Sequence, residues 1–293
     1  MWPLLQIELL KIFRKPRTYI SFGAIALMVI IVQIALKSDG RSYIEFIVGS
    51  LKDSLDIPYT HILNGYFVCF VILNLLLIHI PLLIALVAGD SVAGEANMGT
   101  LRLIASKPVS RTGLMLAKFF ATVIYTALLL IWLAFVALLL SILLFSTNDI
   151  LIARNDALEI IRSNDVLWRY AAAFAFATLA LTTVAALAFL LSVFADNSIG
   201  PIVSTISIVI IFTILSEMQI PLYDRTIKPF LFTSHMLAWK GFFYSKVDAG
   251  GAAISGTVEN IRAIAKSCGI LVLYIVGFVS AAIYVFNRKD ILS

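Results

Sequence analysis

The residue types that most often carry chemistry are few and widely separated in this chain. Its three histidines, His61, His79 and His235, have no i, i+4 spacing and no Cys-x-x-Cys companion, so they do not indicate a metal site. No G-x-x-x-x-G-K-[ST] sequence is present, so the chain lacks the glycine-rich loop that holds nucleotide phosphates. Gly89 to Ser91 begins like a hydrolase nucleophile motif, but Ala93 replaces the second glycine. We therefore predict no catalytic, cofactor-binding or metal-binding residue.

The composition of the chain is strongly apolar and indicates which kind of secondary structure holds these residues. Of 293 residues, 61% are hydrophobic and 13% are charged, which is more apolar surface than a soluble domain of this length buries. A bilayer span needs about 20 mostly apolar residues. We predict an all-α membrane protein with six transmembrane helices in a single domain, 1–293, and no room for a soluble catalytic domain. The six stretches are 18–36, 65–89, 113–145, 167–194, 200–217 and 266–286.

The first apolar stretch follows the basic sequence KIFRKPR, as it would in a secretory signal peptide. Its apolar core is too long for a signal peptide and no small-x-small cleavage site follows, so we expect a retained span. Before it, residues 1–17 combine apolar residues with Glu8, Lys11 and Arg14 in a pattern typical of a helix lying in the headgroup layer. A frayed basic tail is the alternative.

The distribution of Lys and Arg predicts the orientation of the spans. Basic residues near span ends favour the cytoplasmic side. With the amino terminus inside, ten of the 22 basic residues fall in short inside segments, so we expect both termini in the cytoplasm. The formal net charge of +5 then indicates anchoring at the bilayer surface, and no nucleic-acid partner. The ten residues are Lys11, Arg14, Lys15, Arg17, Arg102, Lys107, Arg111, Lys118, Arg288 and Lys289.

Few polar residues lie inside the expected spans, the clearest being Gln33, Asn74 and His79. Ion-coupled carriers place charged residues there, so an ion-coupled secondary carrier is a less favoured alternative. We expect the three polar residues to form hydrogen bonds between helices. Cys69 and Cys268 would lie near the same membrane face, where we expect them to pack as buried thiols, and a disulfide is the alternative.

Three connecting segments carry distinct patterns. The segment ADNSIG, 195–200, is so short that the fourth and fifth spans must form a tight helical hairpin. In the loop before the fourth span, Leu158, Ile161 and Leu167 have the spacing of a short amphipathic helix. The outer loop at 218–265 is rich in aromatic residues, which predicts an interfacial or re-entrant structural element.

A charged segment at 90–112 separates the second and third spans. Its apolar residues recur with the helical period over 94–106, which predicts a helix of about three turns with one apolar face. Pro108 would end this helix and Ser110 would cap the next span. Such a helix can lie in the groove of a partner protein, and a plain connecting loop is the alternative. The apolar face would hold Met98, Leu101, Ile104 and Ala105, with Glu95, Asn97 and Arg102 elsewhere.

The sequence GEANMGTLRLIASKPVSRTGLMLAKF resembles the membrane subunits of type 2 ABC transporters, especially bacterial permeases whose ATPase is a separate polypeptide. The shared pattern is Glu, then Gly-Thr-Leu, then Pro-x-Ser-Arg, then Lys. IELLKIFRKPRTYI is similar to that family's amino-terminal connecting helix, and ADNSIG to its fourth-to-fifth turn. The subgroup resembles permeases grouped with copper-enzyme maturation systems. In this chain the shared residues are Glu95, Gly99, Thr100, Leu101, Pro108, Ser110, Arg111 and Lys118.

The resemblance implies a permease subunit of the bacterial inner membrane that has no nucleotide-binding site of its own. ATP and Mg would bind a cytoplasmic ATPase subunit, and a second permease, identical or not, would complete the transporter. Export is expected, because the family consists mostly of exporters, and the loop at 218–265 would be structural or contact the cargo. A membrane scaffold or sensor that uses the same ATPase to act on an extracytoplasmic partner is the alternative. The implied coupling helix would include Glu95, Met98, Gly99, Thr100, Leu101, Arg102, Ile104, Pro108 and Arg111.

Overall fold

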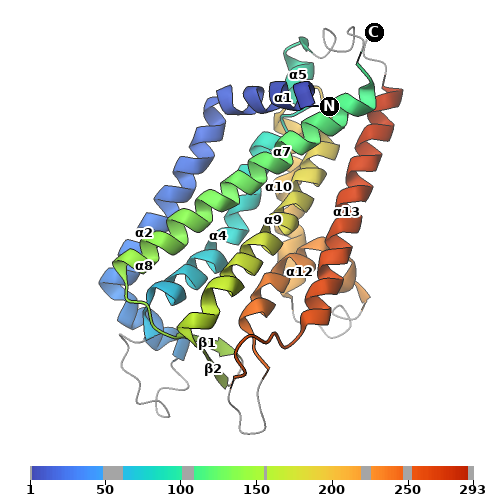
Figure 1. Ribbon diagram of the computed structural model, residues 1–293. Coiled ribbons are helices and arrows are strands. Elements are labelled where there is room, and N and C mark those ends of the chain that lie inside the picture. The colour runs from blue at the N-terminus through green and yellow to red at the C-terminus, as the bar shows by residue number, and fades with distance from the viewer. Residues whose placement is uncertain are drawn as a thin grey trace.

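The computed structural model describes residues 2–48, 62–100, 109–154, 157–218, 226–246 and 253–289. Long helices run side by side, and short elements lie at both ends of the bundle (Figure 1). Within the described residues, five helices are long and apolar enough to cross a membrane, and α4 is a sixth if its two halves form one span. The long helices are α2 (Pro16–Val48), α4 (Gly65–Ala88), α7 (Arg111–Ala134), α9 (Ser163–Phe194), α10 (Ile199–Glu217) and α13 (Ile261–Arg288).

Helix α4 is bent by 55° between Gly65–Leu76 and His79–Ala88. Pro81 lies inside this helix, where it has no N–H to donate to the carbonyl of residue 77 and its ring displaces the preceding turn. Helix α7 instead continues through one turn of π-helix, η2 (Phe135–Leu139), into α8 (Leu140–Leu144). Residues 111–144 therefore form one long apolar element.

Helix α9 lies at the centre of the bundle and packs against α13, α4, α7 and α10. In its most apolar window 67% of the residues are buried, against 22% in α10 and in α13, so lipid can cover these two helices but not α9. Alanines at 173, 177, 180 and 188 are buried along α9. Small side chains allow neighbouring helices to approach closely in a membrane, which explains how α9 contacts four partners.

The polar residues of the spans form structural hydrogen bonds. The Nε2 of Gln33 donates to the Oγ of Ser141 over 3.0 Å, which confirms a bond between two helices. Asn74 and His79 differ from the expectation, because both bond within α4. Asn74 donates to the carbonyl of Phe70 over 2.9 Å, and the Nδ1 of His79 lies 2.8 Å from the carbonyl of Leu75.

A β-hairpin replaces the short amphipathic helix expected around Leu158 and Ile161. Strands β1 (Ile150–Arg154) and β2 (Ala157–Ile161) pair in antiparallel register, with Ile150 opposite Ile161. Only two residues join the strands, and the runs ILIAR and ALEII are rich in branched apolar residues. A short connection between two such runs favours a hairpin over a helix.

The aromatic segment folds against the bundle beside α9 and α13 (Figure 1). It contains η3 (Lys228–Phe230), α12 (Phe232–Met236) and η4 (Leu237–Phe243). The side chains of Phe232, Trp239 and Phe243 are at most 1% exposed. These three aromatic residues are therefore part of the protein core, and the interfacial or re-entrant position of the segment stays a prediction.

Arg169 fixes the end of this segment to α9. Its side chain is fully buried and forms an ion pair with Asp165 over 2.7 Å. It also donates to the carbonyl of Phe242 over 2.6 Å, to the Oγ of Ser245 over 3.0 Å and to the carbonyl of Thr257 over 2.9 Å. One guanidinium thus joins three segments that are distant in sequence.

Helix α1 (Trp2–Arg14) lies across the opposite end of the bundle (Figure 1). Trp2, Ile7 and Leu10 are exposed, and Glu8 is buried, as expected of a helix at a membrane surface. The last turn of α13 is at the same end.

Cys69 is buried, Cys268 is half-buried, and both are free thiols, so the disulfide alternative is wrong.

Candidate functional site: a buried charge cluster beneath the coupling segment

The coupling segment is defined here as residues 90–112, and its first helix is α5 (Ala93–Asn97). Figure 1 shows α5 at the end of the bundle, beyond α1. The Oγ of Ser192, from α9, accepts hydrogen bonds from the backbone N–H groups of Val92 over 3.1 Å and Ala93 over 2.8 Å. The start of α5 is therefore fixed directly to the central helix of the bundle.

The structure corrects the expected single helix at 94–106. Helix α5 ends at Asn97, and Gly99 has a φ angle of +69°. Left-handed backbone of this kind is unfavourable for residues with a Cβ and ends a helix. The helical spacing of apolar residues continues past Gly99, but the positive φ angle of this glycine interrupts the helix.

Glu95 lies on the inner side of α5 and does not face solvent. It is 5% exposed, and its Oε1 lies 2.6 Å from the Nζ of Lys11 and 2.7 Å from the Nζ of Lys118. Glu8 pairs with the same two lysines, at 2.7 Å from Lys11 and 2.9 Å from Lys118. These four residues, Glu8, Lys11, Glu95 and Lys118, form the charge cluster, which joins α1, α5 and α7.

The ion pairs of the charge cluster favour the charged forms of Glu95 and Lys11. Burial raises the pKa of Glu95, but the attraction of Lys118 and hydrogen bonds from Lys11 and Lys118 outweigh it and lower the pKa below its ordinary value. Burial also opposes the charged form of Lys11, but its hydrogen bonds to Glu8 and Glu95 raise the pKa above its ordinary value. The cluster contains two acidic and two basic side chains, so its formal charges balance.

Asp90 makes a second connection, next to the charge cluster. It accepts hydrogen bonds from Lys15 over 2.6 Å, from Arg17 and from Ser198. Burial raises the pKa of Asp90, but these bonds lower it below its ordinary value. A Cβ on Gly94 would overlap the carboxylate of Asp90, so a larger residue would have to displace that carboxylate from its partners. The coupling segment is thereby joined to α2 and to the turn between α9 and α10.

The remaining predicted coupling residues have different environments. Met98 is 59% exposed. Thr100 donates to the carbonyl of Glu95 over 3.3 Å. Arg111 donates to the carbonyls of Asn287 over 3.2 Å and Lys289 over 3.0 Å, which ties the start of α7 to the end of α13. The other predicted residues, Leu101, Arg102, Ile104 and Pro108, lie outside the described residues.

The expected cap is present: the Oγ of Ser110 accepts a hydrogen bond from the N–H of Gly113 over 3.2 Å. Sequence reasoning did not assign a role to Asp90 or Ser192, and it gave Glu8 and Lys118 no partner. One signal was available for Lys118, because a lysine inside an apolar stretch needs a buried counter-charge. Which carboxylate supplies it depends on the tertiary fold.

The arrangement is suited to mechanical connection. One short segment contacts α1 and α7 through the charge cluster, α2 and the α9–α10 turn through Asp90, and α9 through Ser192. A displacement of the segment would therefore act on most of the bundle.

In the part of the chain that the structure describes, no group of three or more His, Cys, Asp or Glu side chains could hold a metal ion.

Two comparisons with known proteins bear on the family of this chain. A search of curated proteins found no match. A family model described as ABC-2 family transporter protein matches residues 2–291, nearly the whole chain. The chain therefore belongs to the ABC-2 family of transporter proteins, and is a multi-pass membrane permease of an ABC transporter system.

Proposed function

We propose that this chain is the permease subunit of an ATP-driven exporter in a bacterial inner membrane, with six spans and both termini in the cytoplasm. A separate cytoplasmic subunit binds ATP and Mg and hydrolyses the nucleotide, and a second permease completes the transport path. Family membership supports the permease role, because ABC-2 permeases are transport components without a nucleotide-binding domain of their own. Export follows from the family resemblance.

One observation carries the coupling proposal. The first turns of the coupling segment expose Met98 but bury Glu95 in the charge cluster. An exposed apolar side chain can fill a groove in a partner, and a buried ion pair transmits the position of the segment to α1 and α7. The segment thus has one side for the ATPase and one side for the membrane helices.

The coupling mechanism follows from these contacts. Closure of the ATPase subunits on ATP displaces the coupling segment. Since the charge cluster and Asp90 join the segment to three helices and a turn, it moves with α1, the start of α2 and the start of α7. Breaking the cluster is unfavourable, because an unpaired charge would remain buried. The helices therefore shift together, and a route opens between the two permeases.

The test is co-purification with the ATPase subunit of the same transporter. Met98, Leu101 and Ile104 are replaced together by alanine, which removes apolar groups worth about 1.5 to 3 kcal/mol each if fully buried in the partner. The triple variant should lose the ATPase. The matched control truncates Leu27, Ile31 and Ile34, exposed apolar residues of α2, and should retain it.

Normal ATPase binding by the triple variant would show that the segment is only a connecting loop. The effect of cargo on the rate of ATP hydrolysis then distinguishes a transporter from the alternative, a membrane scaffold. A transporter hydrolyses ATP faster when its cargo is present in reconstituted membranes, whereas a scaffold responds to its extracytoplasmic partner.

A further inference from the structure

We propose that a cavity beside α9 binds a phospholipid whose head group carries both a primary ammonium and a phosphate, as phosphatidylethanolamine does. The cavity lies between α4, α9, α10, α12 and η4 and has a volume of about 130 Å³. Glu217 pairs with the ammonium and Lys240 with the phosphate. The coupling mechanism proposed above does not use this cavity, so lipid binding is measured on this chain alone.

The buried part of the cavity wall is apolar. Ala177, Ala180 and Leu181 of α9 line it together with Val209 of α10, and all four side chains are buried. A dry apolar cavity of about 150 Å³ can hold a benzene molecule. This cavity therefore has room for a few carbons of one acyl chain, and the rest of the lipid lies outside it.

The accessible part of the wall carries an acidic and a basic side chain. Glu217, the last residue of α10, is exposed, and Lys240 of η4 is half-buried. Within the described residues neither side chain forms a hydrogen bond or an ion pair. A ligand with a single charge would pair with one of them and be repelled by the other, whereas a zwitterionic head group can pair with both.

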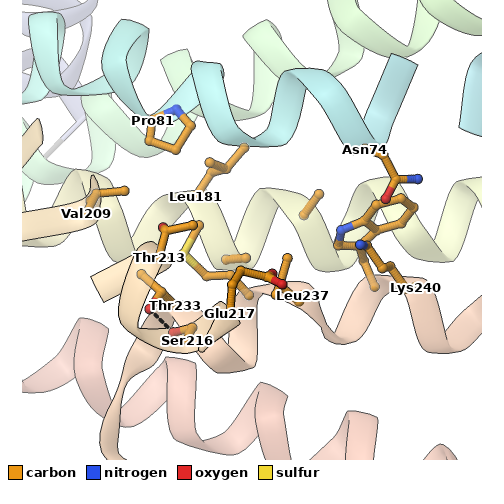
Figure 2. Close-up of a pocket in the computed structure, with 14 residues that line it drawn as sticks. Asn74, Pro81, Leu181, Val209, Thr213, Ser216, Glu217, Thr233, Leu237 and Lys240 are labelled. Carbon is orange, nitrogen blue, oxygen red and sulfur yellow. Dashed lines mark hydrogen bonds between the residues drawn. The ribbon is translucent and has the colours of Figure 1, made fainter. Parts of the chain in front are cut away.

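Two features of α10 favour a primary ammonium beside Glu217. Thr213 precedes Glu217 by four residues, so both side chains lie on one face of the helix, and its hydroxyl forms no hydrogen bond within the described residues. The other hydroxyls of the wall are already used, because Ser216 and Thr233 bond to each other over 2.7 Å and to the carbonyl of Phe212 (Figure 2). The carboxyl end of a helix also carries a partial negative charge. An ammonium with N–H groups can therefore donate to both Thr213 and Glu217.

The charged and apolar parts of the cavity are arranged along the bundle like the parts of a lipid along the bilayer normal. Helix α10 begins beside the coupling segment, where Ser198 bonds to Asp90, and ends at Glu217. Val209 lies about 12 Å before Glu217 along the helix axis. In Figure 2, Val209 lies toward one end of the cavity and Lys240 toward the other. A lipid with its head group at Glu217 thus extends its acyl chain toward the middle of the span.

The test is photolabelling of the purified chain in phosphatidylcholine nanodiscs. A phosphatidylethanolamine with a diazirine in the acyl chain, close to the ester, is added at increasing mole fraction, and labelled peptides are identified by mass spectrometry. We expect labelling of residues 177–181 and 209–217 that saturates. The matching phosphatidylcholine probe has no N–H, so its half-saturation should need a mole fraction about 3- to 10-fold higher, the effect of a charge-assisted hydrogen bond at an accessible site.

Two charge variants assign the contacts. Glu217→Gln should make the two probes bind equally, whereas Asp196→Asn, which removes an exposed acidic side chain outside the cavity, should keep the preference. Lys240→Met should weaken both probes to the same extent, because both carry the phosphate. Lys266→Met, at an exposed position of α13 outside the cavity, should weaken neither.

The apolar part of the cavity is tested separately. Ala180→Leu fills it and should abolish saturable labelling, whereas Ala175→Leu, on the exposed face of the same helix, should not. Free phosphoethanolamine has the head group without the acyl chains and should compete far more weakly than unlabelled phosphatidylethanolamine. Equal competition by the two would assign the site to a soluble zwitterion and overturn the lipid proposal.

Three other results would also overturn it: equal half-saturation of the two probes in the wild type, a preference for phosphatidylethanolamine that persists in Glu217→Gln, or equal labelling of the Ala180 and Ala175 variants. The comparison of the two probes in the wild type needs no variant, so the test survives a folding defect.

Discussion

Replacing Lys118 with methionine should strongly destabilise the α1 end of the bundle. Its side chain is 1% exposed, and its Nζ pairs with Glu8 and Glu95 and donates to the carbonyl of Ser91 over 3.2 Å. Methionine keeps the length and apolar stem but removes the charge. The cluster then changes from no net charge to one negative charge, with two buried carboxylates sharing Lys11.

The expected loss follows from burial. Removing one partner of a buried ion pair costs about 3 to 5 kcal/mol. Lys11→Met is the matched control, because the side chain of Lys11 is 36% exposed and solvent screens its pairs, which limits the loss to about 1 kcal/mol or less. The double variant Lys118→Met/Glu95→Gln should recover part of the loss, since it restores a neutral cluster.

The assay is thermal unfolding of the purified chain in detergent. The expected order of melting temperatures is wild type, then Lys11→Met, then the double variant, with Lys118→Met lowest. Equal melting temperatures for the two lysine variants would refute the argument that burial of the lysine determines the loss. A double variant less stable than Lys118→Met would refute the argument that charge balance stabilises the contact of α1, α5 and α7.

Three further predictions concern Gly94, the lowered pKa values of Asp90 and Glu95, and Arg169. Gly94→Ala should place a methyl group against the Asp90 carboxylate and lower the melting temperature, whereas Gly23→Ala, where the space is open, should not. The pKa values of Asp90 and Glu95 are lowered in the folded protein. Their contribution to stability is therefore present above their unfolded pKa values of about 4 and is lost as the pH falls through the lower folded pKa values. The distance between spin labels on α1 and α5 should be constant from about pH 5 to pH 8 and increase only below about pH 4. Arg169→Met should cost about 3 to 5 kcal/mol, because it leaves Asp165 buried without its ion-pair partner, and limited proteolysis should then cut the aromatic segment faster than in the wild type.

The composition and hydrophobic runs were sufficient to predict the long helices. Each expected stretch lies largely within a helix of the structure, because about 20 apolar residues in lipid must satisfy their backbone hydrogen bonds internally. The bend in α4 could also have been inferred from Pro81. The β-hairpin was missed because the helical period of Leu158 and Ile161 was given more weight than the two-residue connection beside them.

The candidate site was predictable only in part. The position of the coupling segment could be predicted from its charge and from its resemblance to a family pattern. The sequence did not predict that the side chain of Glu95 faces the bundle. Its partners, Lys11 and Lys118, are 84 and 23 positions away in sequence, and only the packing of α1 against α7 brings them together. Likewise, nothing in the sequence indicates that the Nε1 of Trp239 is buried without a hydrogen-bond partner among the described residues.

The central claim, that the charge cluster transmits movement from the ATPase to the spans, is tested most directly by an ATP-dependent distance in the assembled complex. Spin labels replace two exposed residues outside α1 and the coupling segment, Leu143 in α8 and Ile227 directly before η3. In the wild type, ATP should change the distance between the labels. Glu95→Gln should still bind the ATPase and permit hydrolysis, because Glu95 faces the bundle, but the distance should no longer respond to ATP. The same ATP-dependent change in the variant and in the wild type would contradict the account.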